Sequence, residues 1–146
     1  MPQAPFISPT ISARVIHAAL VLGIAVFWFL AWYVGTSELL PVSSLPVSAL
    51  PDRKVLYVAL FLVSGTLFGA AGYTAWRLVP SAVGMSEDEW WRANLGRVIV
   101  VWALVEAPAI LGTVAYLLTR DFRTLLAPFT GLLFFVNYRP SRFTER

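Results

Sequence analysis

The chain has 146 residues, of which 58% are hydrophobic and 13% are charged. A soluble domain contains about 25% charged residues, and here the uncharged residues form blocks long enough to cross a bilayer. The absence of cysteine excludes disulfides, thiolate catalysis and cysteine metal sites. Because a backbone in lipid must satisfy its own hydrogen bonds, we expect an all-α integral membrane protein that forms one transmembrane domain over residues 1–146.

The first half of the chain predicts two spans. Residues 1–12 contain three prolines and no charged side chain, and they are interpreted as a short irregular arm. The first span covers about residues 15–34, and its apolar run is too long for the core of a signal peptide. A proline-rich loop follows at residues 35–52, where a proline at every fifth position excludes a regular helix. The second span covers about residues 55–78.

The second half predicts two further spans. A polar loop at residues 79–97 contains Ser86 and Glu89, which have the spacing of a helix capping box. Trp90 and Trp91 follow, where aromatic side chains are expected to anchor a helix in the headgroup layer. The third span covers about residues 98–118. After a tight polar turn, a short fourth span covers about residues 122–138, which completes an antiparallel four-helix transmembrane bundle.

Basic residues beside the predicted spans indicate the orientation of the chain. With four spans, the two termini and the middle loop share one side of the membrane, and that side carries seven of the eleven basic residues. These seven are Arg14, Arg77, Arg92, Arg97, Arg139, Arg142 and Arg146. Since basic residues accumulate on the cytoplasmic side, both termini are predicted to be cytoplasmic in a multi-pass protein of the cell inner membrane. The net charge of +3 therefore reflects topology, and no nucleic-acid partner is expected.

Glu106 is the residue whose position most strongly suggests chemistry. It lies near the middle of the third span, where a carboxylate costs at least about 2.5–3.5 kcal/mol and where desolvation favours the neutral acid. Pro108 has no amide hydrogen for the carbonyl of Leu104, and helical spacing places Thr113 on the face of Glu106. Glu106 and Thr113 are therefore candidates for carrying a proton or binding a cation. The alternative is a neutral Glu106 that hydrogen-bonds another helix and holds the bundle in register.

The second span carries small residues that would allow another helix to approach closely. Gly65 and Gly69 form a Gly-x-x-x-Gly pair, and Ser64 and Gly72 flank them. Together with Pro108, these residues are the candidates for helix packing. The spacing identifies no particular partner.

A helix with small residues, a polar loop and a helix that reads Ala103-Leu104-Val105-Glu106 resemble the hairpin of the ring-forming c subunits, the proteolipids of rotary ATPases. The resemblance covers residues 61–118, less than half of the chain. It implies that Glu106 matches the carboxylate that carries the proton or sodium ion in that family. It also implies a cytoplasmic polar loop, in agreement with the distribution of basic residues.

His17 is the single histidine and lies near the predicted cytoplasmic end of the first span. Imidazole ligates metals, so His17 is a candidate for binding heme or chlorophyll, with a structural role as the alternative. One histidine cannot form a metal site alone, and no catalytic triad, phosphate loop or nucleotide motif is present. We therefore expect a non-enzymatic protein without a metal site.

The sequence favours an accessory or structural subunit that packs against other membrane subunits in the lipid bilayer, and self-association into a homo-oligomer is a further possibility. Proton or cation handling through Glu106 is the alternative function. Cofactor binding through His17 is a lesser alternative.

Overall fold

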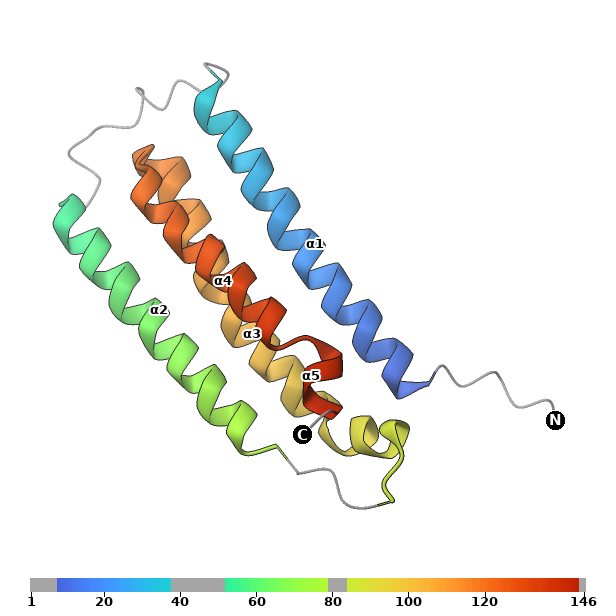
Figure 1. Ribbon diagram of the computed structural model, residues 1–146. Helices are drawn as coiled ribbons and strands as arrows, with labels where there is room; N and C mark the ends of the chain where they lie inside the picture. Colours follow the sequence, from blue (N-terminus) through green and yellow to red (C-terminus); the bar gives the residue numbers. More distant parts are fainter. Residues whose placement is uncertain (1–7, 38–51, 79–83, 145–146) are drawn as a thin grey trace.

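The computed structural model describes residues 8–37, 52–78 and 84–144. These residues form helices and no strands (Figure 1), which confirms the prediction of an all-α chain. The helices in chain order are α1 (Pro9–Thr36), α2 (Arg53–Trp76), α3 (Glu87–Thr119), the 3₁₀ helix η3 (Phe122–Leu125), α4 (Leu126–Asn137) and α5 (Pro140–Thr144). Most of the predicted proline-rich loop, and the first residues of the predicted polar loop, lie outside the described residues.

Three of the helices are long and apolar enough to cross a membrane. They are α1 with 28 residues, α2 with 24 and α3 with 33, and a span needs about 20 apolar residues. Residues 122–137, which include η3 and α4, form a shorter apolar helical segment. Since α4 has 12 residues, it extends for about 18 Å, less than the thickness of a hydrocarbon core.

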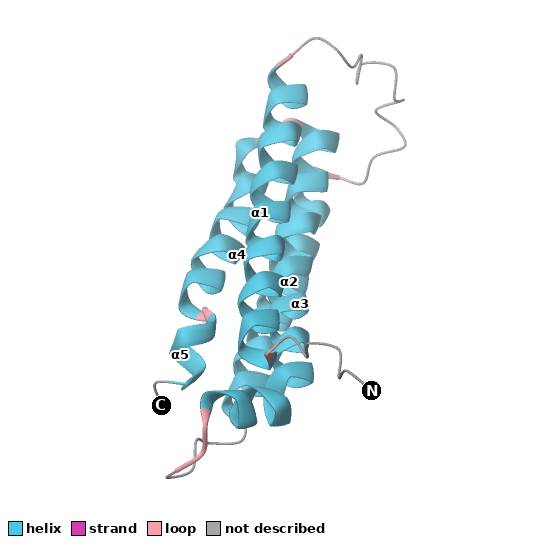
Figure 2. Ribbon diagram, turned by 90° about the vertical axis from the view of Figure 1, so that its right-hand side faces the viewer, coloured by secondary structure: helices cyan, strands magenta, loops and turns pink. Residues whose placement is uncertain are grey.

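Helix α3 is the centre of the structure, because α1, α2 and α4 all pack against it. Half of its most apolar 18-residue stretch is buried inside the protein, against 11% for α1 and for α2. Helices α1 and α3 run in one direction, and α2 and α4 run in the other (Figure 1). The view in Figure 2 shows that the long helices lie alongside one another.

The helices begin at caps that the local sequence explains. At the start of α3, Ser86 accepts a hydrogen bond from the amide of Glu89 while the Glu89 carboxylate accepts one from the amide of Ser86, which confirms the predicted capping box. Helix α1 begins at Pro9, so the prediction of an irregular arm up to residue 12 is wrong for residues 9–12. A proline fits the first turn of a helix, where its missing amide hydrogen has no partner to lose. The Thr10 hydroxyl then joins α1 to α3 by donating to Asp88 Oδ1 at 2.6 Å.

The opposite end of the protein is held by the turn after α3. Arg120 adopts a left-handed conformation with φ 55°, and its guanidinium donates to the carbonyl of Val34 at the end of α1 at 2.8 Å. The hydroxyl of Tyr57 on α2 donates to the carboxylate of Asp121. This turn therefore connects the ends of α1 and α3 to the beginning of α2.

Two glycines allow α3 and α4 to pack closely. A Cβ atom at Gly112 would lie 2.6 Å from the Cβ of Ala127 and 2.7 Å from the carbonyl oxygen of Thr124. At Gly131 it would lie 3.0 Å from the Cβ of Ala109. Since carbon atoms pack at about 3.5–4.0 Å, a side chain at Gly112 would force the two helices apart.

Aromatic side chains fill the core at the end where α3 begins. Trp91, Trp102 and Phe143 are almost fully buried, and the Tyr138 ring stacks on Phe143 with a centroid distance of 6.0 Å. Trp90 and Trp91 are only 3% and 0% exposed, so the prediction that they anchor α3 in the headgroup layer is wrong for these two residues. Phe143 of the short helix α5 contacts both indoles, and local sequence does not reveal this contact.

Candidate functional site

Glu106 lies on α3 at the edge of the face that α3 presents to the rest of the protein. Val105 and Ala109 are fully buried against Gly131 of α4, whereas Ile110 is 40% exposed. Helical spacing places Glu106 between these two sides, and its side chain is partly buried. Glu106 therefore lies neither in the core nor fully on the outer surface.

The residues that the structure describes give Glu106 no hydrogen bond and no ion pair. The one ion pair among them joins Arg14 and Glu87, 3.4 Å apart, at the end where α1 and α3 begin. Thr113 is buried and its hydroxyl donates to the carbonyl of Ala109 at 2.8 Å, so it is bound to its own helix. The structure brings the predicted pair onto one helix face without bringing a polar partner to the acid.

Pro108 is buried within α3, which continues without interruption on both sides of it. Because proline has no amide hydrogen, the carbonyl of Leu104 lacks its usual helical partner. This carbonyl lies close to Glu106 along the helix, as the sequence predicts. A carboxylic acid could donate to such a carbonyl, whereas a carboxylate could not.

His17 caps the carboxyl-terminal end of α4. Its Nε2 lies 3.0 Å from the carbonyl oxygen of Phe135, one of the last carbonyls of α4, which have no partner within the helix. A carbonyl only accepts hydrogen bonds, so Nε2 is the protonated nitrogen. The ring packs edge-on against Trp102 at 5.2 Å, and the indole Nε1 of Trp102 donates to the carbonyl of Tyr138 at 2.9 Å.

These two hydrogen bonds satisfy the backbone where α4 ends and the chain turns into α5. Heme or chlorophyll ligation through Nε2 would require the His17 bond to Phe135 to break. The residues described contain no group of three or more histidine, cysteine, aspartate or glutamate side chains that could hold a metal ion. The geometry of His17 accounts for its presence through a structural role.

The small residues of α2 lie on different sides of that helix. Ser64 is buried, whereas Gly65 and Gly69 are exposed, and nothing lies within 4 Å of a Cβ atom placed on either glycine. Gly72 lies near the Tyr138 hydroxyl, at 3.7 Å from a Cβ atom placed on it. Beside both glycines of the Gly-x-x-x-Gly pair there is therefore space that no other described residue fills.

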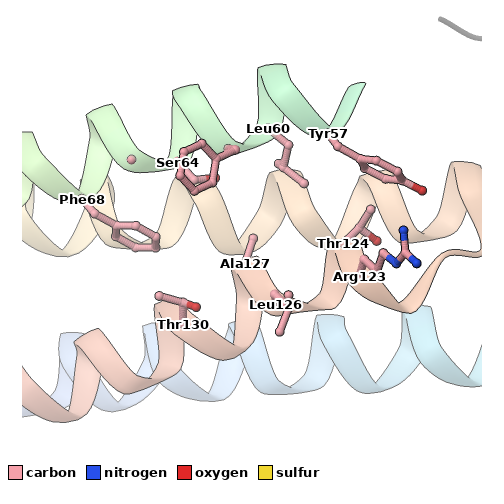
Figure 3. Close-up of a pocket in the computed structure, with 11 residues that line it drawn as sticks. Tyr57, Leu60, Ser64, Phe68, Arg123, Thr124, Leu126, Ala127 and Thr130 are labelled. Carbon is pink, nitrogen blue, oxygen red and sulfur yellow. The ribbon is translucent and has the colours of Figure 1, made fainter. Parts of the chain in front are cut away.

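A groove lies between α2 and α4 (Figure 3), and the sequence analysis did not predict it. Its volume is about 510 Å³, and it is lined by apolar side chains with an arginine at one end. The signal present in the sequence is a stripe on α2 at helical spacing, from Tyr57 through Phe61 and Ser64 to Phe68. That stripe resembles any buried helix face, so only the relative position of α4 reveals the groove.

Comparison with protein-family models, with curated proteins and with solved structures gives no match.

Proposed function

We propose that this protein is a non-enzymatic membrane subunit that packs against other membrane-embedded helices, as an accessory or structural component of a larger complex. The observation that supports this proposal is Glu106, an acid near the middle of α3 that is partly exposed and has no partner among the described residues. Exposure of such a group to lipid costs at least about 2.5–3.5 kcal/mol. A polar group on a neighbouring subunit would remove this cost.

The outer faces of the long helices support the same proposal. Phe61 on α2 is 77% exposed and Leu22 on α1 is 64% exposed, and the Gly65–Gly69 pair leaves the backbone of α2 accessible. Small residues allow close approach of a second helix, which is how helices associate in lipid. These faces suit contact with partner helices as well as with lipid chains.

The proposed topology has four spans with both termini in the cytoplasm of a cell with an inner membrane. The fourth span consists of residues 122–137, which run back along α3. In support, α5 follows directly and contacts the first turns of α3 through Phe143. Arg139 and Arg142 then lie on the side that the count of basic residues assigns to the cytoplasm.

Proton or cation handling at Glu106 is the second candidate function. The observation that favours it is the unpaired carbonyl of Leu104 beside a partly exposed acid, since a protonated carboxyl group and a free carbonyl form a polar notch in an apolar helix. In this case Glu106 would act within a ring or another homo-oligomer of the chain, as the resemblance to proteolipids implies.

Two variants of Glu106 distinguish the two functions. Glu106→Gln retains a hydrogen-bond donor and acceptor, and Glu106→Leu removes both. If Glu106 joins a partner subunit, the native mass in mild detergent is preserved in the glutamine variant and reduced in the leucine variant. Glu87→Gln, the same change at the first residue of α3, is the control and is expected to leave the native mass unchanged.

If Glu106 instead carries a proton or cation, the glutamine variant keeps its native mass but loses transport in reconstituted vesicles. The native mass is also measured for the unmodified protein extracted from its own membrane. A native mass equal to that of a monomer would contradict both functions. An absorption band in the visible range of the purified protein would revive cofactor binding through His17, and a colourless preparation is expected.

A further inference from the structure

The groove between α2 and α4 has an apolar wall and is closed at one end. Both helices pack against α3, and the groove between them is lined by residues of α2, η3 and α4 (Figure 3). The rings of Phe68 and Phe134 stack across one end with centroids 4.6 Å apart. The hydrogen bond between Tyr57 and Asp121 lies at the other end, which is polar.

The length of the groove matches one leaflet of a bilayer. From Tyr57 to Phe68 the α2 wall extends for about 16 Å, and half of a hydrocarbon core is about 15 Å. The Tyr57 end lies at the beginning of α2, where the chain is polar, and the Phe68 end lies near the middle of that helix. A groove with this placement runs from the headgroup layer to the bilayer midplane, which is the path of one acyl chain.

The open polar end carries an excess of positive charge. The described residues there include four basic and two acidic side chains: Arg53, Lys54, Arg120 and Arg123 against Asp52 and Asp121. Both acids are engaged as helix caps, Asp52 with the amide of Lys54 at 3.0 Å and Asp121 with the amide of Arg123 at 2.9 Å. The cations therefore outnumber the acids, and an anion is the complementary ligand.

Arg123 contributes directly to the lining of the groove, beside Tyr57 (Figure 3). A guanidinium group binds phosphate oxygens through two parallel hydrogen bonds. Deeper in the groove, the hydroxyl of Ser64 is buried without a hydrogen-bond partner among the described residues. A phosphate at Arg123 and a chain that begins with polar ester groups would present acceptors at the mouth of the groove and hydrocarbon beyond it.

We propose that this groove binds an anionic phospholipid, with the phosphate at Arg123 and one acyl chain between α2 and α4 as far as the Phe68–Phe134 stack. The charge excess at the mouth distinguishes an anionic lipid from a zwitterionic one. It also disfavours residues 38–51 of this chain as occupants, because the segment contains a single acidic residue, Glu38, to complement several basic side chains.

The test uses the full-length protein in mild detergent and measures lipid binding by native mass spectrometry. The probes are phosphatidylglycerol and phosphatidylcholine with identical acyl chains. Phosphatidylglycerol is expected to bind about fivefold more tightly for each basic side chain close to the headgroup, because the choline group of phosphatidylcholine carries a compensating positive charge. Equal binding of the two lipids, or equally tight binding of inorganic phosphate without any chain, would overturn the proposal.

Two pairs of variants locate the lipid. Arg123→Gln is expected to remove most of the preference for phosphatidylglycerol, whereas Arg139→Gln, at the other end of the bundle, is expected to retain it. Gly65→Leu places a side chain in the groove and is expected to weaken binding of both lipids. Gly69→Leu, one turn further along α2 and outside the groove lining, is its matched control.

Other occupants give different results. If a second copy of the chain or residues 38–51 filled the groove, Gly65→Leu would change the native mass or the stability of the protein without changing lipid binding. Each of these outcomes contradicts the proposal. Because the lipid preference is measured on the unmodified protein, the proposal stays testable even if one variant fails to fold.

Discussion

Replacement of His17 tests how the end of α4 is stabilised. His17→Phe keeps an aromatic ring against Trp102 and Phe135 but removes the Nε2 hydrogen that caps the carbonyl of Phe135. A buried carbonyl without a partner costs about 1–3 kcal/mol, and the low polarity of the surroundings gives water little opportunity to replace the lost bond. We therefore expect the free energy of unfolding to fall by about 1–3 kcal/mol.

The assay is equilibrium unfolding in mixed micelles, with helix content measured by circular dichroism. Trp102→Phe removes the second cap, the bond to Tyr138, and is expected to cost a similar amount. Because both bonds hold the same turn, the double variant is expected to lose less than the sum of the two single losses. A His17→Phe protein as stable as the unmodified one would refute the role of His17 as a cap.

Three further predictions concern the helix contacts and the turn after α3. Gly112→Ala is expected to lower the free energy of unfolding by about 1–3 kcal/mol because the new Cβ atom would collide with α4. Gly96→Ala is the control on the same helix, and it is expected to cost nothing because nothing lies within 4 Å of the new Cβ atom. Arg120→Gly and Arg120→Ala both lose the hydrogen bond to the end of α1. The alanine variant is expected to be less stable than the glycine variant by about 1 kcal/mol because φ at this position is 55°. Equal stabilities of the two variants would contradict this account of the turn. The hydrogen bond from Tyr57, the amide of Arg123 and the nearby arginine charges lower the pKa of Asp121, so its contribution to stability is present above the pKa of the unfolded chain and is lost as the pH falls through the lower folded value. In unfolding experiments at pH 7, 5 and 3, Asp121→Asn is therefore expected to be less stable than the unmodified protein at pH 7 and to approach it at pH 3; parallel pH profiles would exclude this role.

The candidate residues illustrate where sequence reasoning succeeds. The capping box at Ser86 is a local pattern, and it forms as predicted because its two hydrogen bonds join residues only three positions apart. The position of Glu106 along α3 is equally local. The lack of a polar partner for Glu106 among the described residues is not a local property, because it depends on which helices surround Glu106.

The sequence by itself determined the class of this protein: long uncharged blocks must form helices in lipid, since only an internally hydrogen-bonded backbone is stable there. It also determined the position of each glycine and proline along those helices. Only the tertiary structure decided which faces meet. It buried Trp90 and Trp91 under Phe143, turned His17 toward the end of α4 and left a groove between α2 and α4. These contacts join residues that are far apart in the chain. The local sequence does not predict them, because side-chain packing depends on how whole helices lie against one another.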